Sequence, residues 1–181
     1  MRTKLATIAA LSVLTLAGTA AAQKTESLGV GGGGSPHVKT TWTVNGATIS
    51  IAYGRPSLKG RPEAQLMPAA KPWRTGADEA TIITTDKPLT FGEVKLAPGT
   101  YTINTEPGDK DWHLILGKLD KPGQWGIPYQ QQLELGRVPM KLTRASKPAE
   151  QVTINVDADA TPTLKVEWGT VVASAPFKVG K

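Results

Sequence analysis

The chain has 181 residues, of which 20% are charged, and it carries a formal net charge of +6 with no cysteine. The lack of cysteine excludes disulfide-stapled scaffolds, cysteine-ligated zinc sites and a lipid-anchored lipoprotein. Basic and acidic residues are interspersed without a basic run, which argues against a nucleic-acid partner.

The N-terminus has the pattern of a signal peptide. Arg2 and Lys4 precede an apolar run from residue 5 to 16, and three alanines, 20–22, follow it. The run is too short to span a bilayer. We therefore expect residues 1–22 to be cleaved, leaving a periplasmic or secreted chain of net charge +4 without a membrane span.

Residues 23–36 are predicted to form a flexible linker. Gly31, Gly32, Gly33, Gly34 and Ser35 give it the composition of an unstructured tether. These glycines do not fit a phosphate-binding loop, since no strand precedes them and no Lys-Ser/Thr pair follows. Residues 37–181 then form a single domain.

Two alternating apolar runs open the domain. Residues 38–44 and 49–53 flank Asn45 and Gly46, and an Asn-Gly pair between such runs predicts a β-hairpin because both residues tolerate positive φ. In the following segment, 54–72, a long helix is forbidden by Pro56, Gly60, Pro62, Pro68 and Pro72, with one helical turn expected over 63–67. A loop of this length is usually functional or covers a sheet edge.

Short strand patterns continue to the C-terminus, and no window has the spacing of a helix of ten or more residues. We expect an all-β fold, an antiparallel β-sandwich of Greek-key or jelly-roll type with one long Pro/Gly-rich loop. Residues 96–101 suit a tyrosine corner, which favours the Greek-key form, and Gly169 is expected to be a hairpin turn. The expected strands are 80–85, 89–91, 94–96, 101–105, 112–117, 138–142, 152–156, 163–168 and 171–177.

Several long motifs resemble the family catalogued as domain of unknown function 2911. The two most specific are Tyr-Gly-Arg-Pro-Ser-Leu-Lys-Gly-Arg at 53–61 and Trp-Arg-Thr-Gly-Ala-Asp-Glu-Ala-Thr at 73–81. Segments 35–37, 96–101, 136–140 and 164–169 fit it as well. The resemblance implies an exported bacterial β-protein and no reaction. Asp78 departs from it, because the family is expected to carry Asn there more often.

An arginine-aromatic patch is the sharpest candidate site. Arginines beside aromatic side chains and a carboxylate would suit a glycan, a peptide or a small anion. In the competing interpretation, Arg74 and Glu79 form an internal ion pair that fixes the loop. The candidate ligand-binding residues are Tyr53, Arg55, Lys59, Arg61, Trp73, Arg74 and Glu79.

Catalysis has less support in the sequence. Asp78 and Glu79 would point to opposite faces if they lay in a strand, so they are not expected to form a catalytic pair. His37 and His113, the only histidines, are expected to be ordinary surface or cap residues, with no metal and no cofactor. Trp125, like Trp73, is a candidate ligand platform.

The sequence therefore favours a binding or structural module of the cell envelope. The alternative is a hydrolase or lyase acting on an envelope polymer, with Glu79 as acid or base.

Overall fold

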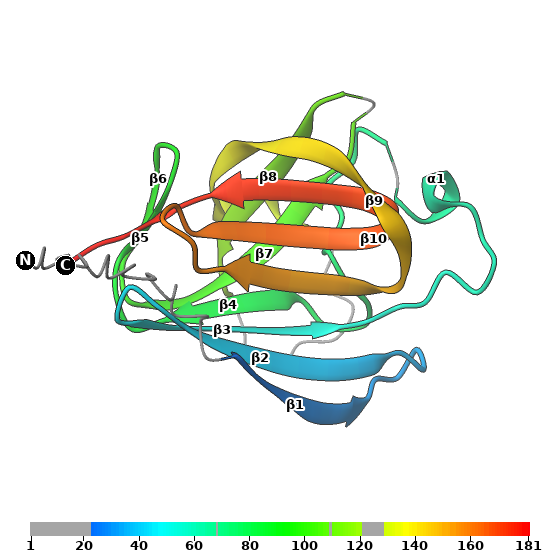
Figure 1. Cartoon of the computed structure of the whole chain (residues 1–181), viewed down its shortest axis with the longest axis horizontal. Coiled ribbons are helices and arrows are strands. Elements are labelled where there is room, and N and C mark those ends of the chain that lie inside the picture. The colour runs from blue at the N-terminus through cyan, green and yellow to red at the C-terminus, as the bar shows by residue number, and fades with distance from the viewer. Residues whose placement is uncertain (1–22, 68, 109, 121–128) are drawn as a thin grey trace, which may run out of the picture.

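The computed structural model describes residues 23–67, 69–108, 110–120 and 129–181, so the expected signal peptide and Trp125 lie outside the described residues. The all-β antiparallel expectation is confirmed (Figure 1). Eight strands form the large sheet, in the order β1 (Gln23–Val30), β2 (Pro36–Val44), β3 (Ala47–Gly54), β4 (Thr81–Thr85), β7 (Gly99–Glu106), β8 (Trp112–Lys118), β9 (Glu134–Asp157) and β10 (Thr163–Pro176). The remaining elements are β5 (Leu89–Phe91), β6 (Val94–Leu96) and β11 (Lys178–Val179), which make a small sheet, and the short helices α1 (Glu63–Leu66) and η1 (Gln131–Leu133).

The predicted hairpin is confirmed as β2–β3. Asn45 and Gly46 have φ of 48° and 75°, and Val44 pairs with Ala47 on either side of them. Positive φ at both central residues gives the turn a twist that matches the two strands. The hairpin buries Trp42, Ile49 and other alternate side chains.

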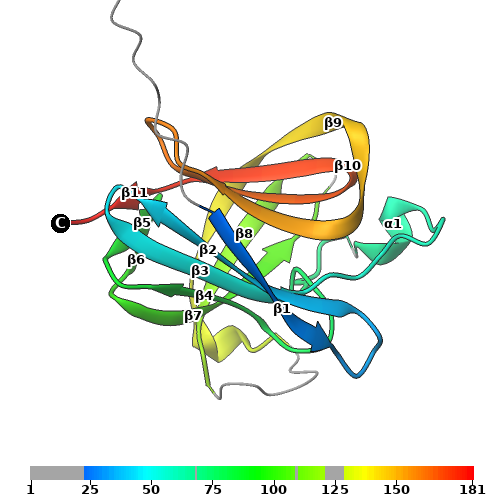
Figure 2. The same cartoon turned by 60° about the horizontal axis from the view of Figure 1, so that its bottom comes forward.

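The large sheet rolls over on itself through β9. This strand is a long, strongly curved ribbon that turns back over the core (Figures 1 and 2). Its first part pairs with β8 and its last part pairs with β10. Side chains from β3 and β4, such as Ile51 and Ile83, therefore share one core with Ile154 and Val166.

Gly169 is not a hairpin turn, and residues 163–176 form one continuous strand. Gly169 has φ of 58° and pairs with Ala149, while Val171 pairs with Arg144, so residues 145–148 bulge out of β9. A bulge of this kind bends the strand and increases its twist. The glycine serves that bend, which the sequence pattern could not distinguish from a turn.

The segment after β3 covers the free edge of β9. Covering a sheet edge was one of the two roles expected for the long loop. Pro56 accepts a hydrogen bond from the Val152 amide (3.1 Å), and the Leu58 amide donates to the Glu150 carbonyl (2.8 Å). Ser57 forms an isolated bridge with Gln151. These bonds close the rolled sheet into a sandwich-like body. Among the described residues, the strands of the large sheet follow one another in chain order, so this part of the chain has no Greek-key crossover.

The expected linker is wrong over its first part. Gln23–Val30 is β1, which pairs with β2 from Gln23–Trp42 to Val30–Pro36. Every side chain of β1 is exposed, so the strand is held by main-chain hydrogen bonds to β2 and by one side-chain bond, between the hydroxyls of Thr25 and Thr40 (3.1 Å). A strand that buries no side chain lacks the alternating apolar pattern by which strands are predicted.

The tyrosine corner is confirmed locally. The Tyr101 hydroxyl donates to the Ala97 carbonyl over 2.9 Å, across the turn that leads from β6 into β7. Within the described ranges, no helix has both the length and the apolar character that a membrane span needs.

Candidate functional site

The loop from Trp73 to Ala80, which leads into β4, is held to β7 and has an unusual backbone. The amide and carbonyl of Trp73 bond to the carbonyl and amide of Thr105 (2.7 and 2.8 Å), and the buried Thr75 hydroxyl donates to the Thr105 hydroxyl (3.1 Å). Thr75 and Asp78 have φ of 56° and 64°. Such conformations are costly for residues other than glycine and gather at functional sites.

Asp78 and Glu79 converge on His37. His37 Nε2 donates to Asp78 Oδ2 over 2.9 Å, and His37 Nδ1 lies 3.1 Å from Glu79 Oε2. The side chains of His37 and Asp78 are 11% and 6% exposed, while that of Glu79 is 36% exposed. We call these three residues the histidine–carboxylate centre. It has one sealed end, at Asp78, and one end near solvent, at Glu79.

The glycine-rich turn between β1 and β2 caps the sealed end. The Gly33 amide donates to Asp78 Oδ1 over 2.9 Å, so both oxygens of that carboxylate are engaged. A Cβ atom at Gly31 would collide with Asp78 Oδ2 and His37 Nε2, and one at Gly33 would collide with Asp78 Oδ1. Gly31 and Gly33 of the expected tether are thus required to be glycine, because the backbone approaches the centre closely at these two positions.

One oxygen at the other end has no partner. Glu79 Oε2 is buried and makes no hydrogen bond with any described residue. The approach of His37 Nδ1 is close enough for a hydrogen bond but lacks its alignment. A buried carboxylate oxygen without a donor is costly, and in a native protein it requires an explanation.

Two expectations about this loop are corrected. Asp78 and Glu79 do not alternate across a strand, because β4 begins at Thr81 and the positive φ of Asp78 turns its side chain toward His37. Arg74 and Glu79 form no ion pair among the described residues. Arg74 Nη1 instead donates to the main-chain carbonyl of Asp78, which holds the loop in this turn.

Tyr53 and Arg55 lie on one face, as expected, and that face meets β9. The buried Tyr53 hydroxyl accepts the Ile154 amide over 2.9 Å, and burial raises the pKa of this hydroxyl. Arg55 donates through Nε to the Val152 carbonyl (3.0 Å) and through Nη2 to the Thr153 hydroxyl (2.9 Å). Both side chains join the two layers of the fold.

The other candidates are dispersed. Trp73 stacks on Trp168, with ring centroids 5.5 Å apart. The exposed Arg61 donates to the carbonyls of Ser57 and Leu58 in its own loop, and Lys59 donates through its amide to Glu150 Oε1. The seven candidate residues therefore do not meet in one pocket, and most of them make contacts within the protein.

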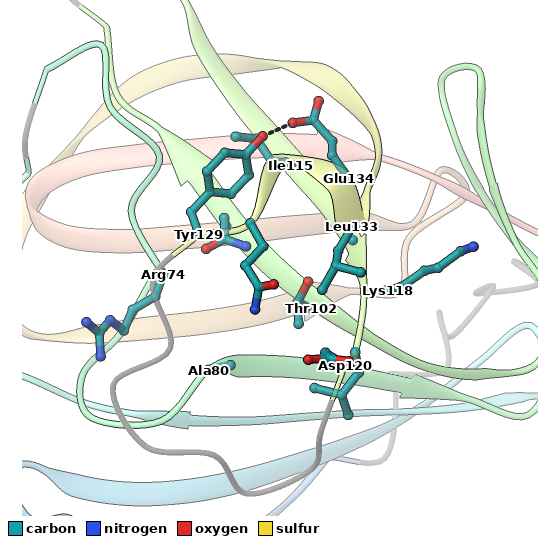
Figure 3. A pocket seen from close by; sticks show the side chains of 13 residues that line it. Arg74, Ala80, Thr102, Ile115, Lys118, Asp120, Tyr129, Leu133 and Glu134 are labelled. Carbon is teal, nitrogen blue, oxygen red and sulfur yellow. Dashed lines mark hydrogen bonds between the residues drawn. The ribbon is translucent and has the colours of Figure 1, made fainter.

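A pocket opens instead on the outer face of β7 and β8, where only Arg74 of the seven candidates lies. Its volume is about 40 Å³, room for roughly three water-sized groups. Figure 3 shows Arg74 and Lys118 on opposite sides of it, with Thr102 and Leu133 between them. We call it the sheet-face pocket. It is lined by Arg74, Ala80, Thr102, Asn104, Ile115, Gly117, Lys118, Leu119, Asp120, Tyr129, Gln130, Leu133 and Glu134.

One wall of this pocket is a fixed polar network. Glu134 accepts hydrogen bonds from the Tyr129 hydroxyl and from Arg137 Nε (2.9 Å), and Arg137 Nη1 donates to Glu106 (2.8 Å). The hydrogen bond from Arg137 is the main cause that lowers the pKa of Glu134, while burial raises the pKa of Tyr129. This wall therefore carries a fixed carboxylate and a neutral phenol.

Sequence reasoning missed His37 and the pocket for different reasons. His37 and Asp78 are 41 residues apart, and no local spacing connects them. For His37, the available signal was the run of glycines before it, which composition alone assigned to a tether. For the pocket, the signal was an apolar residue, Ile115, on the side of β8 opposite Leu114 and Leu116. Ile115 is buried, so other residues cover that outer face.

A comparison with protein-family models finds one match, described as "Protein of unknown function (DUF2911)", over residues 35–177. Neither a curated protein nor a solved structure matches the chain.

Proposed function

Because the chain belongs to the DUF2911 family, whose description names no reaction, we propose a function from the site itself. We propose that the protein is an exported binding module of the cell envelope, and that a glycan places one of its polar groups in the sheet-face pocket. Export is supported by the signal-peptide pattern of residues 1–22.

The observation that carries the proposal is the lining of the pocket. Part of its lining is apolar, with Ile115 and Leu133, and part offers donors and acceptors together, including Asn104, Gln130 and Asp120. A lining that mixes apolar and polar groups suits a sugar, which presents hydroxyl groups around a ring with apolar faces.

The size and charge of the pocket favour a glycan over a small anion or a peptide. At about 40 Å³ it admits a hydroxyl-sized or amide-sized group and not a whole ligand, so the rest of the ligand would lie across the open sheet face. Arg74 and Lys118 are balanced by Asp120 and Glu134, so the pocket has no excess of positive charge to hold an anion.

The test is calorimetric titration of the protein with envelope glycan fragments, short peptides and small anions. We expect the glycan fragments alone to bind. Lys118→Ala and Asn104→Ala should weaken that binding at least fivefold, while Lys95→Ala, an exposed lysine on β6, should leave it unchanged. Equal binding by all three variants, or binding of anions alone, would contradict the proposal.

One observation favours the second candidate, acid–base chemistry by Glu79 on an envelope polymer. Glu79 is free of Arg74, partly exposed, and backed by His37 and Asp78, which is an arrangement suited to proton transfer. If an activity is found, Glu79→Gln must abolish turnover with the protein still folded. Full turnover by Glu79→Gln would eliminate this candidate.

A further inference from the structure

We infer that the histidine–carboxylate centre is a binding site for a divalent transition-metal ion of the zinc type, with His37 Nδ1 and Glu79 Oε2 as ligands. Asp78 orients the imidazole and does not bind the ion. The inference does not depend on the proposed glycan site, because none of these three residues lines the sheet-face pocket.

Asp78 sets the tautomer of His37. Carboxylate Oδ2 of Asp78 can only accept, so the hydrogen bond of 2.9 Å places the proton on Nε2. In the neutral imidazole, Nδ1 then carries the lone pair and faces Glu79. A metal-binding histidine commonly donates its other ring N–H to a carboxylate in this way, which fixes the ring and raises its basicity.

His37 Nδ1 and Glu79 Oε2 lie in close contact. With the proton on Nε2, two acceptors face each other at 3.1 Å, and Oε2 is buried with no hydrogen bond. A metal ion or a proton between the two atoms would make the contact favourable. Two ligand atoms each about 2.1 Å from one zinc ion stand roughly 3.0–3.4 Å apart for bond angles of about 90–110°. The observed separation falls in that range.

The geometry of this contact favours a metal ion over a proton. A proton on Nδ1 would need Oε2 in line with the N–H bond, and Oε2 lies off that line. A metal ion accepts its ligands at an angle to one another, so a bent arrangement of nitrogen and oxygen suits it. All three residues offer ligand atoms within 4.8 Å of one another.

The charges around the centre agree with a cation. Two carboxylates and a neutral imidazole sum to two negative charges, one of them on the nearly buried Asp78. The cation that contacts this loop, Arg74, is directed to the Asp78 carbonyl and neutralises neither carboxylate by an ion pair among the described residues. A nitrogen ligand with a carboxylate suits zinc and its neighbours better than Mg²⁺ or Ca²⁺, which prefer oxygen alone.

The solvent-facing end of the centre determines the remaining ligands of the ion. Two protein ligands leave two positions of a tetrahedral ion vacant, and Glu79 lies on the side nearer solvent. Water or an external ligand would fill those positions. We therefore expect an exchangeable ion rather than a structural one that the fold requires.

The test uses Zn²⁺ alone on the purified protein after chelation. The chain has only two histidines, so ¹⁵N NMR of the imidazole rings resolves the site. We expect one Zn²⁺ to shift His37 Nδ1 strongly while Nε2 keeps its proton. Glu79→Gln and His37→Gln should weaken Zn²⁺ binding at least tenfold, and Asp78→Asn about 10–100-fold. His113→Gln, on β8, should change it less than twofold.

Several results would overturn the inference. They are no change of the His37 signals at ~1 mM Zn²⁺, a shift of Nε2 in place of Nδ1, or undiminished binding by both Glu79→Gln and His37→Gln. Urea unfolding of each variant checks that it folds, and Glu79→Gln keeps the shape of a side chain already 36% exposed. Loss of glycan binding in the pocket variants, with Zn²⁺ binding intact, would separate the two proposals.

Discussion

His37 and Asp78 form a hydrogen bond of 2.9 Å that joins the start of β2 to the loop before β4, and the Gly31–Ser35 turn is closed over it. The turn, the histidine and the aspartate therefore make one packed unit. Its stability should depend on the absence of side chains in the turn.

Gly31→Ala tests that packing. The added methyl group would collide with the carboxylate of Asp78 and the ring of His37, so we expect a loss of about 1–3 kcal/mol in the free energy of unfolding. Urea denaturation measures it. Gly34→Asn is the control, because Gly34 has φ of 82° with open space around it and Asn tolerates that conformation. If both variants were as stable as the parent, the packed turn would be contradicted and the flexible tether predicted from composition would be supported.

Trp73→Ala tests whether this residue is a ligand platform or a packing element. The stack on Trp168 should be worth about 0.5–1.5 kcal/mol beyond the buried area. A double-mutant cycle with Trp168→Ala, followed by chemical unfolding, should return a coupling energy of that size. A coupling near zero, together with loss of ligand binding in Trp73→Ala, would favour the platform interpretation.

Two tyrosines allow a matched comparison of buried and exposed hydrogen bonds. Tyr53→Phe leaves the buried Ile154 amide without its acceptor, which should cost about 1–3 kcal/mol. Tyr101→Phe removes an exposed bond to the Ala97 carbonyl, whose oxygen water can reach, and should cost about 0.5–1.5 kcal/mol. Thermal unfolding of both variants gives the order, and a larger loss for Tyr101→Phe would contradict the role of Tyr53 in joining the layers.

The anchor of α1 should weaken in acid. Burial acts to raise the pKa of Glu63, but hydrogen bonds from the Thr170 amide and hydroxyl and from Arg144 outweigh it, so this pKa lies below its ordinary value of 4.5. The folded state therefore binds this proton less readily than the unfolded state does. The stabilisation is complete above pH 4.5 and is lost as the pH falls through the lowered pKa.

Hydrogen exchange at the Thr170 amide measures this effect. Protection should fall in acid for the parent protein and should be low at every pH for Glu63→Gln. A parent protein whose Thr170 protection does not change down to the lowest pH at which it stays folded would contradict the role of Glu63.

Local chemistry in the sequence was sufficient for much of the fold. The Asn45-Gly46 turn, the corner at Tyr101 and the single turn of α1 each follow from residues next to one another in the chain. Gly169 illustrates the limit, since a glycine between two apolar runs fits a bulge as well as a hairpin. Which of the two structures Gly169 forms depends on residues 145–148, which bulge out of the strand paired with it.

The centre lay beyond the reach of local patterns. The arginine-aromatic motifs were interpreted as a candidate ligand site, but Arg55, Arg61 and Trp73 make contacts within the fold. Strand alternation would place Asp78 and Glu79 on opposite faces, whereas the positive φ of Asp78 brings its side chain to the same histidine as Glu79. A single histidine 41 residues away then completes the centre through tertiary contact alone.

The most direct test of this account is the protonation of the His37 ring in the metal-free protein, read from one-bond and long-range ¹H–¹⁵N correlations at a pH where the ring is neutral. The account predicts a proton on Nε2, held by Asp78, and an unprotonated Nδ1. In Asp78→Asn, that preference should weaken. A proton on Nδ1 with a bare Nε2 would contradict the account, because Asp78 would then have no donor from the ring and Nδ1 would have no lone pair to offer a metal ion.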